Sequence, residues 1–352
     1  MTGGLCQYKY TQHESLRRKA MSRTISSEGE LIATYLAPLT RRMPGALGLQ
    51  DDCAVLVPPP GTELVVTTDA VAAGVHFFEA DSPRDIAWKA LAVNVSDLAA
   101  KGAVPLAYQM ALSFPEAPAH EWLAGFAAGL DEAQSALGLG LLGGDTDKRP
   151  GPLTITITAF GYVPKGRMVL RSGTKPGDVI LVSGTLGDSA LGLKLRYAPD
   201  LAGQWNLDLA AAQHLAKRYL RPEPRLALGP ALRDTASASM DISDGLAKDL
   251  ERLCKASKVS ARVDLSQVPL SAGVKAALAA NPALLSSVVS GGDDYEILCT
   301  VPAANVAAFQ AAAEACGVAV QPIGTVSAGS GVVLEGHDGV AMPMGRSGWD
   351  HF

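Results

Sequence analysis

Short apolar segments alternate along the chain with longer segments rich in alanine, and this alternation limits the fold classes that the chain can adopt. Strict period-two alternation, as in residues 154–158, predicts a strand with one polar face. The Ala-rich segments 83–101 and 119–137 predict helices, and each is followed by a glycine, Gly102 or Gly138. Because strands and helices follow one another in mixed order, the sequence predicts an α+β (mixed α/β) fold rather than a strict doubly wound sheet.

The same patterns predict the remaining elements in two groups, separated by a Pro- and Gly-rich stretch at residues 163–177. Before it, the sequence predicts a short helix from Glu28 and strands at residues 54–57, 64–67, 106–112, 139–142 and 153–162. After it, the sequence predicts strands at residues 178–182, 261–265, 295–301, 323–326 and 332–335, and helices at residues 187–196, 208–219, 225–233, 245–258 and 305–316. We therefore expect a flexible extension at residues 1–25, an N-terminal domain at residues 26–165 and a C-terminal domain at residues 166–352.

The composition excludes several classes of protein. With 48% hydrophobic residues among 352, the chain can bury a core, which excludes wholesale disorder. The formal net charge of −5 and the aromatic content of 5% disfavour nucleic acid as the main partner. The five cysteines include no CxxC pair, so we expect no disulfide framework, no thiolate zinc site and a reducing, cytoplasmic compartment. No apolar run reaches the length of about 18 residues that a membrane-spanning helix needs.

Six short segments place aspartates beside glycine or hydroxyl residues at the edge of an apolar run. They are Gln50–Cys53, Thr67–Ala70, Asn94–Asp97, Gly143–Thr146, Asp241–Gly245 and Gly291–Tyr295. An ionised carboxylate next to a core needs a partner, and basic residues are scarce in these segments. Magnesium takes carboxylate, hydroxyl and phosphate oxygens as ligands, so the recurrence of the pattern favours a magnesium site. For any single segment the alternative is a helix cap or turn former.

Individual polar residues each leave two interpretations open. Asp97 lies in a segment that is apolar nearly all round, so we expect it to be buried, either in a magnesium site or paired with Lys101 four residues later. His76 is either a hydrogen-bonded core histidine or a contact to phosphate or substrate. Arg171 either clamps a phosphate or forms a surface ion pair, and Trp349 either fills a core or stacks on a flat ligand.

Eight segments, taken in order, resemble the thiamine-monophosphate kinase family, and the resemblance covers residues 26–352. The segments are Asp51–Ala54, Thr67–Asp69, Gly74–Phe77, Ala92–Leu98, Gly143–Thr146, Asp241–Leu246, Ser290–Glu296 and Trp349–Phe352. The resemblance implies a fold like that of aminoimidazole ribonucleotide synthetase, with an N-terminal α/β domain that dimerises through its sheet and a C-terminal α/β domain. It also implies phosphoryl transfer from ATP to thiamine phosphate, which gives thiamine diphosphate and ADP.

The resemblance assigns roles to residues of this sequence. The residues implied to bind magnesium are Asp52, Thr67, Thr68, Asp69, Asp97, Asp145, Asp241 and Asp244. Those implied to contact ATP are Gly144, Asp145, Arg171 and Ser243, and those implied to contact thiamine phosphate are His76, Asp293 and Trp349. Catalysis is expected to depend most on Asp69, Asp97 and Asp145. Two residues depart from the family pattern, since Gln50 stands where glycine is usual and Asp293 where glutamate is usual.

The chemistry of the implied acceptor fits a site rich in carboxylates. A phosphate monoester is mostly ionised at neutral pH, so it needs no general base, and the chain has no GxxxxGK[ST] motif. Magnesium ions held by carboxylates would offset the repulsion between the two phosphates and permit direct in-line transfer. Two alternatives stay open: another ATP-using enzyme of the same superfamily, such as a ring-forming or selenophosphate synthetase, or a non-catalytic protein that binds nucleotide or magnesium.

Overall fold

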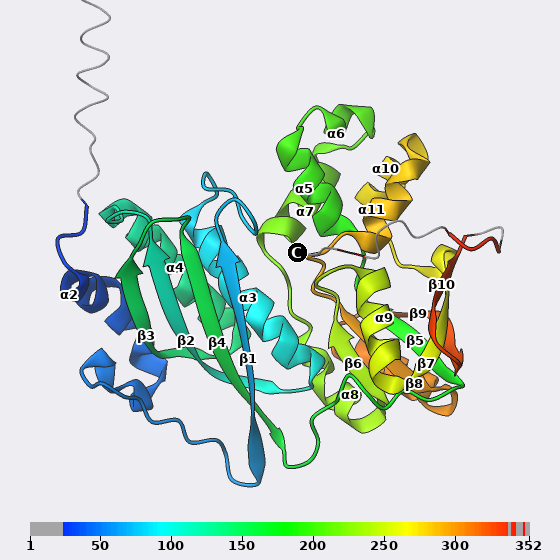
Figure 1. The fold of residues 1–352 in the computed structure, drawn as a ribbon, viewed down its shortest axis with the longest axis horizontal. Helices are drawn as coiled ribbons and strands as arrows, with labels where there is room; N and C mark the ends of the chain where they lie inside the picture. The colour runs from blue at the N-terminus through cyan, green and yellow to red at the C-terminus, as the bar shows by residue number, and fades with distance from the viewer. Residues whose placement is uncertain (1–23, 337–338, 343–347, 349–352) are drawn as a thin grey trace, which may run out of the picture.

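The computed structural model describes residues 24–336, 339–342 and Gly348, and it contains two units that are each built on one β-sheet (Figure 1). The first unit holds a four-stranded sheet and the second a six-stranded sheet. Both sheets mix parallel and antiparallel neighbours, which confirms the predicted α+β fold class. The predicted flexible extension at residues 1–25 lies almost wholly outside the described residues. Within the described ranges, no helix is both long and apolar enough to cross a bilayer.

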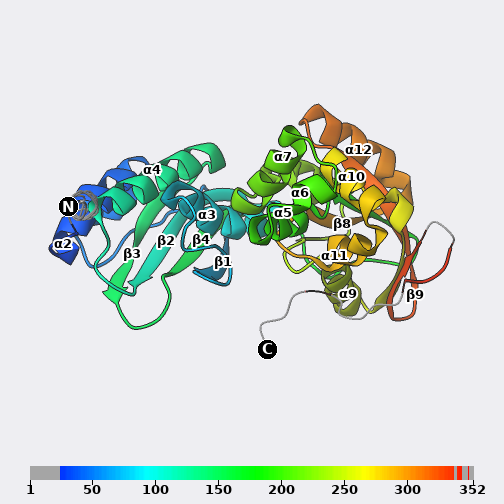
Figure 2. The same ribbon diagram turned by 90° about the horizontal axis from the view of Figure 1, so that it is seen from above.

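The first sheet has strands in the order β1 (Thr62–Ala72), β4 (Thr154–Pro164), β2 (Val104–Phe114) and β3 (Gly140–Lys148). Helices α3 (Pro83–Ala100) and α4 (His120–Leu137) cover one face, while the short helix α2 (Glu28–Leu31) lies at the β3 side (Figures 1 and 2). Along β4 the residues alternate between buried and half-buried, so Ile155 and Ile157 pack towards the helices and the threonines between them face away. The predicted alternation is thereby confirmed.

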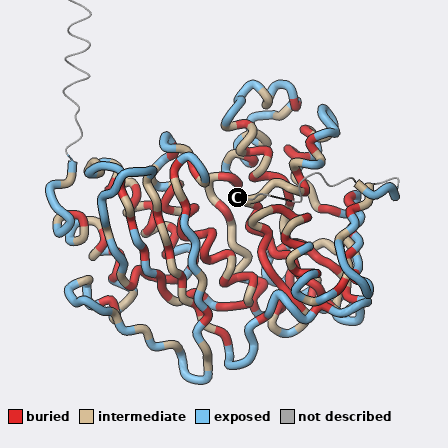
Figure 3. The backbone as a smooth tube through the Cα atoms, viewed as in Figure 1, coloured by how far each residue is buried: buried red, intermediate tan, exposed pale blue. Residues whose placement is uncertain are grey.

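Helix α3 is buried over most of its length because it lies between the two sheets. Ser82 caps its first turn by accepting a hydrogen bond from Arg84 N, Pro83 occupies the first turn, and Gly102 follows with φ +67°. Its neighbours include β1 and β4 of the first sheet and β6 and β8 of the second. This position explains why the helix is apolar nearly all round, and Figure 3 shows the buried stretch in the middle of the molecule.

The second sheet has the strand order β10-β7-β9-β5-β8-β6. Its strands are β5 (Asp178–Ser183), β6 (Ala238–Asp241), β7 (Val259–Asp264), β8 (Ile297–Pro302), β9 (Val320–Ala328) and β10 (Gly331–Glu335). The helices of this unit are α5 (Asp188–Tyr197), α6 (Leu201–Gln204), α7 (Leu209–Leu220), α8 (Gly229–Thr235), α9 (Leu246–Ser257), α10 (Ala272–Ala280), α11 (Leu285–Ser290) and α12 (Val306–Ala315). A separate apolar cluster, which includes Trp205 and Leu215, joins α5, α7 and α10 (Figure 1).

The structure corrects the predicted elements at a few places. The strand predicted at residues 54–57 is wrong, because the segment is extended but belongs to neither sheet, and Val55 N bonds instead to Gly45 O at 2.9 Å. Strand β6 and helices α6, α10 and α11 were not predicted from the sequence. Strand β6 is only four residues long and carries Ser239 and Asp241, so it lacks the apolar run on which strand prediction depends.

Candidate active site at the junction of the two units

Strand β1 and helix α3 bring two of the predicted acids, Asp69 and Asp97, together. Thr67 and Asp69 lie on the face of β1 that contacts α3, since residues two apart on a strand share a face. Thr67 Oγ1 donates a hydrogen bond to Asp97 Oδ2 at 2.5 Å, and Asp69 N donates to Asn94 Oδ1 at 2.9 Å. The strand and the helix are therefore held in one register. Asp97 is half-buried rather than buried as predicted.

The second unit adds Asp241, the last residue of β6, to this group. Its side chain is buried, and Asp241 Oδ2 accepts a hydrogen bond from Ser96 Oγ of α3 at 2.6 Å. Burial, followed by the negative charge of Asp97, raises the pKa of Asp241 to about 8. The sequence left open an ion pair between Asp97 and Lys101. In the structure, Lys101 Nζ instead donates a hydrogen bond to Ser239 O at 2.5 Å.

The loop between β6 and α9 presents Asp244 to the same region. Asp249 Oδ2 accepts hydrogen bonds from Ser243 N at 3.0 Å and Asp244 N at 2.9 Å, which fixes the loop. Asp244 itself pairs with Arg252 at 2.6 Å and with Lys248 at 3.3 Å. The predicted magnesium ligand therefore already has cationic partners in this structure.

The electrostatics show that the acids of both units act on one another. The pKa of Asp69 is raised to about 6, first by partial desolvation of the carboxylate and then by the charges of Asp97 and Asp244. The residue nevertheless stays in contact with solvent. The carboxylates of Asp69, Asp97, Asp241 and Asp244, with the hydroxyls of Thr67 and Ser243, are hard-oxygen donors of the kind that magnesium prefers. Within the part of the chain that the structure describes, no three such side chains are close enough to form a finished metal site.

Three of the other predicted magnesium ligands lie elsewhere. Thr68 points to the opposite face of β1, where its Oγ1 donates to Ile157 O at 3.1 Å. Asp52 is exposed in the segment before β1. Asp145 is exposed on β3, at the far edge of the sheet from β1; with β4 and β2 between them, the two strands are about 14 Å apart. A single chain does not bring Asp52 or Asp145 next to Asp69.

The predicted nucleotide and substrate residues surround the same junction in part. Gly144 lies beside Asp145 on β3 with φ +157°, and a Cβ there would collide with Met110 O of β2. Arg171 is exposed, and its charge, after the effect of burial, contributes to lowering the pKa of Lys101 to about 8. Ser243 is half-buried in the loop that carries Asp244.

The three residues predicted to contact thiamine phosphate are placed as follows. His76 Nδ1 accepts a hydrogen bond from Ala72 N at 3.1 Å, just beyond the end of β1. Asp293 lies before β8 and contacts Lys89 of α3. Trp349 is outside the described residues. The preceding residue, Gly348, packs against Asp244 O and Lys248, so the chain reaches the loop that carries Asp244.

Sequence reasoning missed several polar residues that the structure places here. Ser96, Asp249 and Lys89 contact predicted site residues, and none was singled out as a functional residue. Lys89 was the one with a usable signal, because a lone lysine in a helix that is apolar all round needs a buried partner.

Comparisons with known proteins match this chain over most of its length. The family models for the N-terminal and C-terminal domains of AIR synthase related proteins match residues 50–163 and 175–337. A thiamine-monophosphate kinase of Caulobacter vibrioides is 43% identical over 328 residues, which cover 92% of this chain and 91% of the relative. The thiamine-monophosphate kinase of Escherichia coli strain K12 is 41% identical over 327 residues, which cover 92% and 98%.

Solved structures of similar proteins share the whole architecture. A thiamine-monophosphate kinase from Stenotrophomonas maltophilia K279a has a TM-score of 0.75 at 34% identity and covers 96% of this chain and 98% of its own. The structure of AaThiL complexed with AMPPCP and TMP has a TM-score of 0.71 at 29% identity and covers 100% of both chains. The chain therefore belongs to the thiamine-monophosphate kinase family, whose members are built from the two AIR synthase related domains.

Proposed function

We propose that this protein transfers a phosphoryl group from ATP to thiamine phosphate and releases thiamine diphosphate and ADP. The observation that carries the proposal is the acidic region at the junction of the two units, where the charges of Asp97 and Asp244 act on Asp69 and the charge of Asp97 acts on Asp241. Relatives at 41–43% identity over 92% of the chain carry the name of this activity, and a similar structure holds an ATP analogue and TMP. Both supports point to the same reaction.

The chemical difficulty of this reaction is repulsion between the two substrates. Two dianionic phosphates about 4 Å apart repel by roughly 4 kcal/mol even in water, and by more in a drier site. The four carboxylates would hold magnesium, which when bound supplies the positive charge that offsets this repulsion. The acceptor phosphate is already ionised, so no side chain needs to remove a proton, and we propose direct in-line transfer without a phosphoenzyme.

Further roles follow from the family assignment and stay proposals. We propose that Gly144, Asp145, Arg171 and Ser243 contact ATP, and that His76, Asp293 and Trp349 contact thiamine phosphate. Asp52, Thr68 and Asp145 are proposed as additional magnesium ligands. The division of the chain at residue 165 is likewise proposed, with nucleotide and magnesium held by the N-terminal domain together with Arg171, Asp241, Ser243 and Asp244 of the C-terminal domain.

The test is ADP release measured with the full chain, ATP, magnesium and thiamine phosphate. We expect ADP to form only when thiamine phosphate is present, together with an equal amount of thiamine diphosphate. ADP release without the acceptor would instead indicate a simple ATPase or a different ATP-using enzyme of the superfamily. Binding of ATP without any turnover would leave a non-catalytic nucleotide-binding protein and refute the proposed activity.

We also propose that two copies of the chain associate through the open face of the first sheet. That face exposes apolar side chains on β1, where Leu64 is 41% and Val66 is 55% exposed, and Val55 and Val57 are exposed just before the strand. Exposed apolar residues gathered on one sheet face are typical of a protein–protein interface.

Val66→Asp should therefore convert a dimer into a monomer, because it places a charge in the centre of the proposed interface. Light scattering coupled to gel filtration gives the molar mass directly. Leu209→Asp, at an exposed leucine of α7 in the second unit, is the matched control and should keep the wild-type mass. A monomeric wild-type protein, or a Val66→Asp variant that stays dimeric, would contradict this interface.

A further inference from the structure

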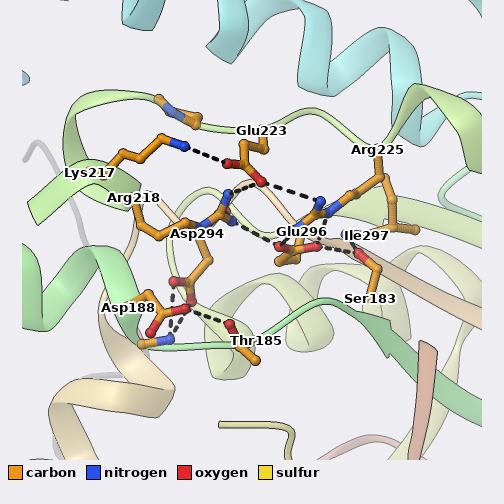
Figure 4. Close-up of polar contacts among 12 residues, drawn as sticks. Ser183, Thr185, Asp188, Lys217, Arg218, Glu223, Arg225, Asp294, Glu296 and Ile297 are labelled. Atoms are coloured by element: carbon orange, nitrogen blue, oxygen red, sulfur yellow. Dashed lines mark hydrogen bonds and ion pairs between the residues drawn. The ribbon is translucent and has the colours of Figure 1, made fainter. Parts of the chain in front are cut away.

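Residues 293–296 alternate between the two units, and this alternation defines how Asp293 is held. Asp294 and Glu296 point into the second unit (Figure 4). Asp294 accepts hydrogen bonds from Gly187 N at 3.0 Å at the start of α5, and Glu296 accepts from Arg218 at 2.8 Å and from Ser183 at 2.5 Å. The backbone on both sides of Tyr295 is therefore anchored to the second unit.

Asp293 and Tyr295 point the other way, towards the first unit. The side chain of Tyr295 packs in the apolar core of the first unit, and its hydroxyl donates to Asp293 Oδ1 at 3.1 Å. Both residues have positive φ angles, +69° for Asp293 and +51° for Tyr295, which non-glycine residues rarely adopt. A segment in this conformation persists only where its surroundings determine it, so the contacts of Asp293 are part of its placement.

The second oxygen of Asp293 contacts a buried lysine of the first unit. Lys89 lies on α3 with 3% of its side chain exposed, and its Nζ is 2.7 Å from Asp293 Oδ2. The same ammonium lies 3.7 Å from the centre of the Tyr219 ring of α7. A buried ammonium needs such partners, because its desolvation is unfavourable unless a carboxylate or an aromatic face compensates.

The tyrosine extends this set of contacts to the second predicted substrate residue. Tyr219 is buried, and its hydroxyl donates a hydrogen bond to His76 O at 3.2 Å. Asp293, Lys89, Tyr219 and His76 are thus linked contact by contact. Asp293 and His76, the two residues that the family resemblance places next to thiamine phosphate, are therefore both linked to the buried ammonium of Lys89, Asp293 directly and His76 through Tyr219.

We propose that Lys89 is a positioning residue for the acceptor substrate, since it fixes the carboxylate of Asp293 and, through Tyr219, the loop that carries His76. The exposed fractions separate the two roles. The side chain of Asp293 is 26% exposed and that of Lys89 is 3% exposed, so the carboxylate meets the substrate and the ammonium does not. Thiamine phosphate contains a permanently cationic thiazolium ring, to which a carboxylate in a fixed position is complementary. The inference rests on the function proposed above.

Steady-state kinetics of Lys89→Met test this role. We expect KM for thiamine phosphate to rise about tenfold, as for the loss of one hydrogen bond to a charged group, with kcat and KM for ATP within about twofold of wild type. Arg221→Met is the matched control, because Arg221 also joins the end of α7 to α3, through Asp85 at 2.5 Å, and to α4, through Glu132 at 2.6 Å, without touching Asp293. The Arg221→Met variant should unfold at a lower temperature than the wild type and keep the wild-type KM values for thiamine phosphate and ATP.

A double-mutant cycle with Asp293→Asn shows whether Lys89 acts through Asp293. If it does, Lys89→Met raises KM for thiamine phosphate by a clearly smaller factor in the Asp293→Asn background than in the wild type, because only the route through Tyr219 is left. Lys89→Gln, which keeps a donor in the same place, is measured the same way and replaces Lys89→Met where that variant fails to fold. Unchanged KM in the Lys89 variants, an equal loss for both substrates, or additive effects in the cycle would overturn the inference. An inactive wild-type protein would overturn the proposed function instead.

Discussion

Asp69→Asn is expected to lower kcat by roughly 10²–10³-fold while leaving the protein at least as stable as the wild type. The two effects separate because, among the described residues, the Asp69 carboxylate makes no hydrogen bond or ion pair that supports the fold and lies near acids that repel it. Desolvation and the charges of Asp97 and Asp244 raise the pKa of Asp69 to about 6, so its ionised carboxylate is unfavourable in the folded protein without bound metal. An amide of the same shape removes that repulsion and also removes a ligand charge that the reaction needs.

The measurement pairs kcat at saturating ATP, magnesium and thiamine phosphate with the thermal unfolding temperature. Asp200→Asn is the matched control, since Asp200 is exposed at the start of α6 in the second unit and has no proposed role. It should leave both quantities unchanged. Wild-type turnover in Asp69→Asn under these conditions would contradict the proposed role of the acidic group, and a lowered unfolding temperature would contradict the electrostatic account of Asp69.

The sequence predicted one group of acids, but it could not show which acids of more distant elements join that group. Asp69 and Asp97 could be placed near one another because one ends a strand segment and the other lies on the following helix, which packs on that strand. Asp145 looked equivalent by its glycine and hydroxyl neighbours. Its distance from Asp69 depends on the strand order β1-β4-β2-β3, which places β3 at the far edge, and no local pattern encodes that order.

The contacts between the two units were hidden for a related reason. The sequence of α3 correctly predicted a buried helix. It could not show how many sheets cover the helix, because one or two covering sheets are compatible with the same apolar pattern. The partners of Lys89 and Ser96 lie 204 and 145 residues away in the chain, at Asp293 and Asp241. Pairings over such separations are set by tertiary packing, so only the need for a partner, and not its identity, could be predicted.

Glu296→Leu is expected to destabilise the protein by roughly 3–5 kcal/mol, the largest effect on stability among the substitutions considered. Glu296 is fully buried, and its two oxygens accept from Ser183 Oγ at 2.5 Å, from Arg218 at 2.8 Å and from Arg225 Nε at 2.7 Å (Figure 4). Removing the carboxylate leaves two arginines at a buried position without their main counter-charge. Urea unfolding followed by circular dichroism measures the loss as a shift of the midpoint.

Glu223→Gln is the matched control because Glu223 pairs with the same two arginines from the surface. Its carboxylate is 42% exposed and lies 3.3 Å from Arg218 and 3.5 Å from Arg225. An exposed pair contributes at most about 1 kcal/mol, so this variant should unfold close to the wild-type midpoint. If both variants shifted the midpoint equally, burial would not be what makes Glu296 important. A large loss for Glu296→Leu alone would show that the buried carboxylate stabilises the fold by compensating the charges of Arg218 and Arg225.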